Sequence, residues 1–364
     1  MKKIAIVINH FQISDGVCKT AITLANSLAK YYDFEVTIIP IFKYNPKLKD
    51  SLNDNVFVRP FLKIYFRGLG KIIGILPKRL LYRILIRKKY DIEIGYCMTL
   101  PIKIIANSKN LGAKHFCWMH GYDDGLTLKK YYLKYDKLIC VSKHNSIRAK
   151  KEFSEYSNNI IFAHNLVDEN LIINKSHEEC AIPKKNEYPV LVSVGRQSSE
   201  KGFGRLLLIL SELKKMNFRF NLWLIGSGPE HHNLLKMVET LNLQDDVFLL
   251  GEKKNPHCFT AKADLFVCSS FSEGYSTTCL EACVLGIPVL STDVSGAKEI
   301  IDEAHAGMVV GLDDESLKKG IIEILKNPCI IAKWKDTLKM TKENFYISNR
   351  IPYFVKILDS EKKK

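Results

Sequence analysis

Several common sequence signals are absent from this chain of 364 residues, and each absence excludes a class of protein. No run of 18 or more uninterrupted apolar residues occurs, so the sequence predicts no membrane-spanning helix. The apolar start, Ile4–Ile8, is too short for the core of a signal peptide, and no small-residue cleavage site follows it. With 46% hydrophobic residues, the chain is expected to be a globular cytoplasmic protein with two sizeable cores.

Signatures of metals and dinucleotides are also missing. The ten cysteines include no C-x-x-C pair, and no D-x-D or GxGxxG pattern occurs anywhere. Cys97, Cys140 and Cys268 lie in apolar runs, as reduced core thiols do. Cys279 and Cys283 share a helix face, but further ligands for a metal are not evident, so core packing is favoured. We therefore expect neither a bound metal nor a dinucleotide cofactor.

Acidic residues are scarce in the first half of the chain. Residues 1–180 hold 29 Lys and Arg against 16 Asp and Glu, whereas residues 181–364 hold 25 against 23. Between Asp54 and Asp91 there is no acid at all. That interval contains ten bases: Arg59, Lys63, Arg67, Lys71, Lys78, Arg79, Arg83, Arg87, Lys88 and Lys89.

Apolar residues alternate with these bases at helical spacing, with a break at Pro77. Such a pattern is typical of a surface that lies on a membrane, because anionic lipid attracts basic clusters. We favour a peripheral contact of residues 59–89 with an anionic membrane, at the inner face of the cell membrane. One or two ordinary amphipathic helices with solvated faces are the alternative. Nucleic acid is not expected as a partner, because no nucleic-acid-binding motif accompanies the charge.

Strand and helix patterns alternate along both halves. Residues 2–10 and 34–42 predict buried parallel strands with a helix between them, and residues 189–210 restart the pattern with strand, loop and helix. This order predicts an α/β protein with two doubly wound sheets. A polar segment with two prolines separates the halves. We expect domains at 1–175 and 190–343, a linker at 176–189, and a C-terminal helix at 344–364.

The stretch 269–286 organises the second half. Leu265–Cys268 predicts a buried strand, Gly274 lies in the following turn, and Ser276 or Thr277 is expected to cap a helix. Unpaired N–H groups at a helix start favour an anion. Two carboxylates, Glu273 and Glu281, bracket this loop with seven residues between them. A phosphate at the helix end, with acids that bind hydroxyls on either side, describes a nucleotide sugar.

This segment resembles the E-x7-E motif of retaining glycosyltransferases of family 4, also called group 1 glycosyltransferases, through the letters S-E-G-Y-S, L-E-A and G-I-P-V. The resemblance implies the GT-B fold, in which two Rossmann-like domains face a central cleft. It also implies donor contacts from the loop residues Gly274, Tyr275, Ser276 and Thr277. Glu273 would act in catalysis, and Glu281 would bind the ribose.

Other matches follow the family order. S-V-G-R-x-x-x-E-K-G-F is similar to the family's diphosphate-binding motif, which implies that Arg196 and Lys201 bind the diphosphate without a metal. W-M-H-G resembles the segment that places a histidine, here His120, near the donor sugar. Lys253 falls where the base is expected. The first loop departs from the family's Gly-Gly pair, and we expect Gly16 to keep a tight turn near the donor.

The resemblance implies retaining transfer of a hexose or N-acetylhexosamine to a lipid-linked or cell-surface saccharide in polysaccharide biosynthesis. A UDP-sugar is favoured over GDP-mannose, although backbone contacts to the base leave no side-chain code that names it. Two other functions stay open. One is a GT-B nucleotide-sugar epimerase, and the other is a non-catalytic partner subunit that binds a nucleotide sugar.

Overall fold

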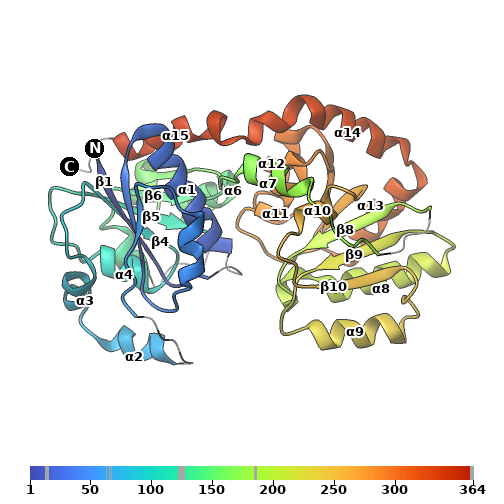
Figure 1. Cartoon of the computed structure of the whole chain (residues 1–364), viewed down its shortest axis with the longest axis horizontal. Helices are drawn as coiled ribbons and strands as arrows, with labels where there is room; N and C mark the ends of the chain where they lie inside the picture. The colour runs from blue at the N-terminus through green and yellow to red at the C-terminus, as the bar shows by residue number, and fades with distance from the viewer. Residues whose placement is uncertain are drawn as a thin grey trace. The chain divides into compact units, whose positions relative to one another are not determined.

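The computed structural model describes residues 1–12, 16–62, 64, 66, 68–121, 128–183 and 187–360. Of the ten bases between Asp54 and Asp91, Lys63 and Arg67 fall outside these ranges. The chain divides into two compact units. Unit 1 comprises Met1–Leu166 with Arg350–Lys364, and unit 2 comprises Val167–Asn349 (Figure 1).

Unit 1 contains a seven-stranded sheet in which every neighbouring pair is parallel. The spatial order is β3-β2-β1-β4-β5-β6-β7, so the strand order reverses between β1 and β4. Ile4 of β1 pairs with Ile92 of β4 across this reversal. The strands are β1 (Lys3–Ile8), β2 (Glu35–Pro40), β3 (Val56–Val58), β4 (Ile92–Tyr96), β5 (Lys114–Met119), β6 (Lys137–Cys140) and β7 (Ile160–Phe162).

Helices cover this sheet because their apolar faces need a partner. Helix α6 begins after Ser142, whose side chain accepts a hydrogen bond from the N–H of Asn145, as the sequence predicts for a cap. Pro77 precedes α3 and separates it from α2. The helices are α1 (Gly16–Tyr32), α2 (Leu69–Ile75), α3 (Lys78–Leu85), α4 (Leu100–Ile105), α5 (Lys129–Tyr132), α6 (Lys143–Glu152) and the short 3-10 helices Pro46–Ser51 and Ser154–Asn159.

Unit 2 repeats the design with a six-stranded parallel sheet in the order β10-β9-β8-β11-β12-β13. Here the order reverses between β8 and β11, where Leu191 pairs with Leu265. The strands are β8 (Val190–Val194), β9 (Asn221–Ile225), β10 (Val247–Gly251), β11 (Leu265–Cys268), β12 (Val289–Thr292) and β13 (Gly307–Val310).

The helices of unit 2 follow its strands in alternation, as a doubly wound sheet requires. They are α7 (Glu169–Ser176), α8 (Phe203–Lys215), α9 (His231–Thr240), α10 (His257–Thr260), α11 (Thr277–Val284), α12 (Ala297–Ala304), α13 (Asp314–Lys326), α14 (Cys329–Thr341) and the 3-10 helices Ser199–Lys201 and Lys342–Phe345. The prediction of two Rossmann-like parallel-sheet domains is confirmed.

Each unit has its own apolar core. In unit 1 a buried cluster joins β1, β2 and β5 to α3, α4 and α5, and in unit 2 a second cluster joins β8, β9 and β11 to α8, α9 and α13. All ten cysteines are free thiols, and Cys97, Cys140 and Cys268 are buried as expected. Among the residues that the structure describes, no helix is both long and apolar enough to span a membrane.

The unit boundaries lie at other residues than the expected ones. Unit 1 ends at Leu166, before the expected 175, because α7 packs against α10 and α11 of unit 2. Near the C-terminus, α15 (Ile347–Asp359) begins in unit 2 and belongs to unit 1 from Arg350 onward. Phe354 of this helix stacks on Trp118 of β5 with ring centroids 5.5 Å apart.

Candidate functional site

The candidate site of unit 2 lies where its strand order reverses. In open α/β sheets the connections on either side of such a reversal run to opposite faces of the sheet, and ligands bind outside the carboxyl ends of the strands there. Here the two loops are 195–202, which follows β8, and 269–276, which follows β11. Both carry residues that the sequence predicts to bind a nucleotide sugar.

Lys201 and Glu273 join the two loops through a direct ion pair. Lys201 Nζ donates to Glu273 Oε1 at 2.6 Å, and Ser270 Oγ donates to the same oxygen at 2.7 Å. The side chains are 24% and 13% exposed. Burial alone would lower the pKa of Lys201, but the charge of Glu273 and its hydrogen bond outweigh burial and raise that pKa. Lys201 is therefore a fixed cation at neutral pH.

Arg205, which the sequence analysis did not single out, holds the second loop in place. Its Nε and Nη2 donate to the carbonyl of Ser269 at 2.8 and 2.6 Å, and Nη2 also reaches the carbonyl of Ser270 at 2.8 Å. Its guanidinium lies 3.8 Å from the ring centroid of Phe271. A basic residue on the apolar face of the helix at 203–215 was the available signal, because a buried charge needs partners.

Gly202 allows the two loops to approach each other. Its φ is +65°, and a Cβ placed there would lie 2.1 Å from the carbonyl oxygen of Ser269. No side chain fits at that distance. The loop that carries Lys201 is therefore pressed against the loop that carries Glu273.

Arg196 occupies the exposed part of the first loop, beside the fully buried Gln197. Gln197 fixes the backbone at this point, since its N–H donates to the carbonyl of Ser227 at 2.9 Å and its Oε1 lies 2.6 Å from Nδ1 of His231. Gly226 permits this contact, because a Cβ there would lie 1.9 Å from the carbonyl oxygen of Gly195. The guanidinium of Arg196 is thus presented on a rigid loop.

Helix α11 begins beside Glu273. Ser276 is its N-cap, as the sequence predicts, and accepts a hydrogen bond from the N–H of Cys279 at 3.4 Å; Thr277 is the first helical residue. Gly274 is half-buried, and Tyr275 is buried against Gly296. The partial positive charge at the start of α11 therefore lies near the carboxylate of Glu273 and the ammonium of Lys201.

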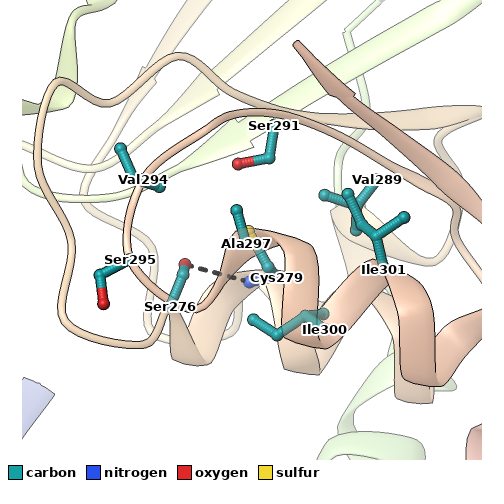
Figure 2. A pocket seen from close by; sticks show the side chains of 9 residues that line it. All are labelled: Ser276, Cys279, Val289, Ser291, Val294, Ser295, Ala297, Ile300 and Ile301. Atoms are coloured by element: carbon teal, nitrogen blue, oxygen red, sulfur yellow. Dashed lines mark hydrogen bonds between the residues drawn. The ribbon is translucent and has the colours of Figure 1, made fainter. Parts of the chain in front are cut away.

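A narrow cavity lies behind this helix start, between α11 and α12 (Figure 2). Ser276, Cys279, Ser295 and Ala297 contribute to its lining, and the rest is mostly aliphatic. The space between the side chains does not accommodate a water-sized sphere. It is a packing gap between α11 and α12 that is too small for a ligand.

Glu281, on α11, and Lys253, after β10, also belong to unit 2. A carboxylate oxygen of Glu281 is 3.7 Å from Nδ1 of His257, a contact between distant segments that the sequence pattern did not indicate. Lys253 is exposed, and its ammonium lies 5.7 Å from the ring centroid of Phe259. It follows the end of β10, where Gly251 has a φ of +67°.

His120 follows β5 in unit 1. Its ring centroid lies 4.5 Å from that of Tyr96, and its buried Nε2 has no hydrogen-bond partner in the described part of the chain. Burial lowers the pKa of His120 to about 3, so the imidazole is neutral at neutral pH. Gly16 is the first residue of α1, and a Cβ added there would meet nothing within 4 Å.

Thr99, which the sequence analysis passed over, lies at the strand-order reversal of unit 1. It precedes α4 with a φ of +82°, a value that a β-branched residue rarely adopts. Asn9, which follows β1, donates to the hydroxyl of Thr99 at 3.4 Å. The reversal in unit 1 is thus also a place where the backbone is held in an unusual form.

The structure brings some of the predicted site residues together. Lys201 and Glu273 are in direct contact, with Gly274–Thr277 next along the chain, and all other donor residues of the second half lie in the same unit. His120 and Gly16 belong to unit 1. Within the described ranges, no group of three or more His, Cys, Asp or Glu side chains is arranged to hold a metal.

Comparison with known proteins points to one family for unit 2. Residues 174–345 match the model of the family Glycosyl transferases group 1. An uncharacterized glycosyltransferase of Haemophilus influenzae is 25% identical over 98% of this chain and 100% of its own length. A Campylobacter jejuni N-acetylgalactosamine-N,N'-diacetylbacillosaminyl-diphospho-undecaprenol 4-alpha-N-acetylgalactosaminyltransferase is 26% identical over 79% of this chain and 77% of its own. These matches support a glycosyltransferase.

The fold is shared with solved structures across the whole chain. Anabaena HepE in complex with UDP superposes with a TM-score of 0.76, at 15% identity, over 99% of this chain and 100% of its own. At that identity the likeness shows the fold alone. The expected two-domain GT-B architecture is confirmed by this neighbour.

Proposed function

We propose that the chain is a retaining glycosyltransferase of family 4. It moves a hexose or N-acetylhexosamine from a nucleoside diphosphate sugar, with UDP as the favoured nucleotide, to a lipid-linked or cell-surface saccharide. The reaction needs no metal. Support comes from the group 1 family match to residues 174–345 and from the relatives, one of which is named for a diphospho-undecaprenol acceptor.

The observation that carries the proposal is the Lys201–Glu273 pair at the strand-order reversal of unit 2. An ammonium has three N–H donors, and Glu273 takes one of them. The remaining donors suit a phosphate oxygen. Glu273 accepts both of its bonds through Oε1, so Oε2 is the atom we assign to a sugar hydroxyl.

The departing diphosphate is stabilised by three positive groups in this proposal. Arg196 supplies a guanidinium fork, Lys201 a point charge, and the start of α11 its partial charge. Groups fixed before the reaction stabilise developing charge most effectively, because no reorganisation is needed. The bonds that anchor Gln197 and the loop of Glu273 give this rigidity. Glu281 binds the ribose diol.

For retention we favour front-face substitution. The bond from the anomeric carbon to the diphosphate breaks, the acceptor oxygen bonds to that carbon on the same face, and a phosphate oxygen of the leaving group takes the acceptor's proton. Glu273 and the neutral imidazole of His120 bind sugar hydroxyls. Mass spectrometry after incubation with donor tests this sequence, since a glycosyl adduct on a protein carboxylate would contradict it.

The acceptor is assigned to unit 1 and to a membrane surface contacted through residues 59–89. The described part of this segment forms two short helices, α2 and α3, on either side of Pro77. Ile72 and Ile75 are 54% and 83% exposed on α2. Exposed aliphatic side chains beside a run of bases suit the interface of an anionic bilayer.

A thermal-shift panel of UDP, GDP, ADP and their sugars, with and without EDTA, tests the donor assignment. A ligand that binds only the folded state raises the melting temperature by mass action. We expect the largest shift with UDP or a UDP-sugar and the same shift in EDTA. A shift that EDTA abolishes would contradict metal independence, and no shift with any nucleotide would contradict the donor site. Conversion of the sugar without any acceptor would identify an epimerase.

A further inference from the structure

A second cavity lies entirely within unit 1, among three helices. Its volume is about 450 Å³, and it is formed where the start of α3, the end of α4 and helix α5 meet. Both α3 and α5 pack on α4, so the cavity is set by the fold of the unit. Its lining includes Lys78, Arg79, Asn107, Lys130, Tyr131 and Lys134.

The lining carries positive charge without a compensating acid. Four of its side chains are Lys or Arg, and none is Asp or Glu. Burial and the nearby charge of Lys103 lower the pKa of Lys78. By contrast Lys129, which is next to Lys130 in the chain, pairs with Glu155 at 2.7 Å. Uncompensated like charges around a cavity favour a bound anion.

The helix start adds to this preference. Lys78 and Arg79 are the first residues of α3, whose backbone N–H groups lack partners within the helix. Asn107 supplies an amide, anchored by its bond to the carbonyl of Lys103 at 2.8 Å. A tetrahedral phosphate suits such a mixture of ammonium, guanidinium and amide donors.

Exposed apolar side chains flank the cavity residues in the sequence. Ile75 and Leu76 directly precede Pro77, and Leu80 directly follows Arg79; they are 83%, 38% and 45% exposed. A soluble phosphate ester would not explain why aliphatic side chains stand in water next to the cations. A phospholipid explains both, because its headgroup is anionic and its chains are apolar.

We propose that this cavity binds the phosphate of an anionic phospholipid headgroup, while Ile75, Leu76 and Leu80 enter the lipid interface. The inference rests on the membrane contact in the proposed function and gives it a defined site. It also adds Lys130 and Lys134, which lie outside residues 59–89 and whose contribution the charge pattern alone does not indicate.

Vesicle sedimentation with matched charge variants tests the site. The full chain is mixed with vesicles of phosphatidylcholine alone or of phosphatidylcholine with phosphatidylglycerol. K130Q/K134Q removes two charges from the cavity, and K88Q/K89Q removes two exposed charges of residues 59–89 that do not line it. We expect the cavity variant to lose roughly tenfold or more in affinity for the anionic vesicles and the control variant a few-fold at most.

Equal losses in the two variants would show diffuse attraction and overturn the site, as would no binding to anionic vesicles. Glycerol 1-phosphate, added without vesicles, separates the sources: cavity-dependent binding of this headgroup with no vesicle binding would assign the site to a soluble phosphate ester and overturn the lipid. The same variants are tested for the thermal shift by UDP. An unchanged nucleotide shift confirms that they are folded and that the donor site stands or fails independently.

Discussion

The two units have the same strand order around the reversal, but their loops there are built differently. In unit 2 the loops 195–202 and 269–276 touch at Gly202 and Ser269, and Gly226 lies equally close to Gly195, so neither glycine has room for a Cβ. In unit 1, Gly16 has open space around it. A backbone pressed against its neighbour has few alternatives, whereas a position with open space, such as Gly16 at the start of α1, tolerates change. The strand-order reversal of unit 2, where the proposed donor site lies, is thus held more tightly by the backbone than the start of α1 in unit 1.

The largest effect is expected from Arg196→Ala. The side chain is exposed, so the fold stays intact, but the leaving diphosphate loses a preorganised cation. We expect release of nucleoside diphosphate from the preferred sugar donor to slow by about 10² to 10³-fold. The exposed Arg219→Ala in the same unit is the matched control and should keep the wild-type rate. His120→Ala, in unit 1, should slow this release less than Arg196→Ala does. If both variants slowed it equally, the proposed difference between the two units in donor chemistry would be wrong.

A smaller effect is expected from alanine at the glycines of the two units. Gly226→Ala places a Cβ against the carbonyl oxygen of Gly195, at a φ of +132°, and should lower the free energy of unfolding by roughly 3 kcal/mol. Gly16→Ala meets no neighbour and should change it by less than about 0.5 kcal/mol. Urea denaturation measures both. Similar losses at the two positions would mean that the backbone at the start of α1 is as constrained as the backbone at Gly226.

The smallest effect is expected on the pH dependence of stability, and it tests the burial of His120 in unit 1. The folded-state pKa of His120 is about 3, below its ordinary 6.5, so between these values the unfolded chain binds the extra proton. Stability should therefore fall as pH drops from 6.5 toward 3, and His120→Gln should reduce that slope by less than about 1 kcal/mol per pH unit. Urea denaturation across this range measures it, with the exposed His144→Gln as control. Identical slopes in wild type and His120→Gln would contradict the burial of the imidazole.

Local features of the fold were predictable because they depend on neighbouring residues. The strand at Leu265–Cys268 and the cap at Ser276 follow from an apolar run, a turn and a hydroxyl within a few residues. The contacts of Arg205 were not predictable, since its partners at Ser269 and Ser270 are more than sixty residues away. The pairing of His257 with Glu281 depends likewise on how α10 and α11 pack.

The motifs predict the residues of the candidate site, but not the contacts between them. Glu273 and Lys201 were assigned separate roles from two motifs, and only the structure shows that they bond to each other. The positive φ of Thr99 could not be predicted from the sequence, because a threonine before a helix is an ordinary cap. The short edge strand Val56–Val58 also went unpredicted, since three residues are too few to show a period.

The division of the chain has a consequence for the order in which the protein is made. Unit 2 is continuous, from Val167 to Asn349, but unit 1 also needs residues from Arg350 onward, which are synthesised after unit 2. Until α15 has been synthesised, Trp118 of β5 lacks the ring of Phe354 that stacks on it. Domains tend to fold as they emerge. The second half of this protein can therefore complete its fold before the first half, even though the first half is synthesised earlier.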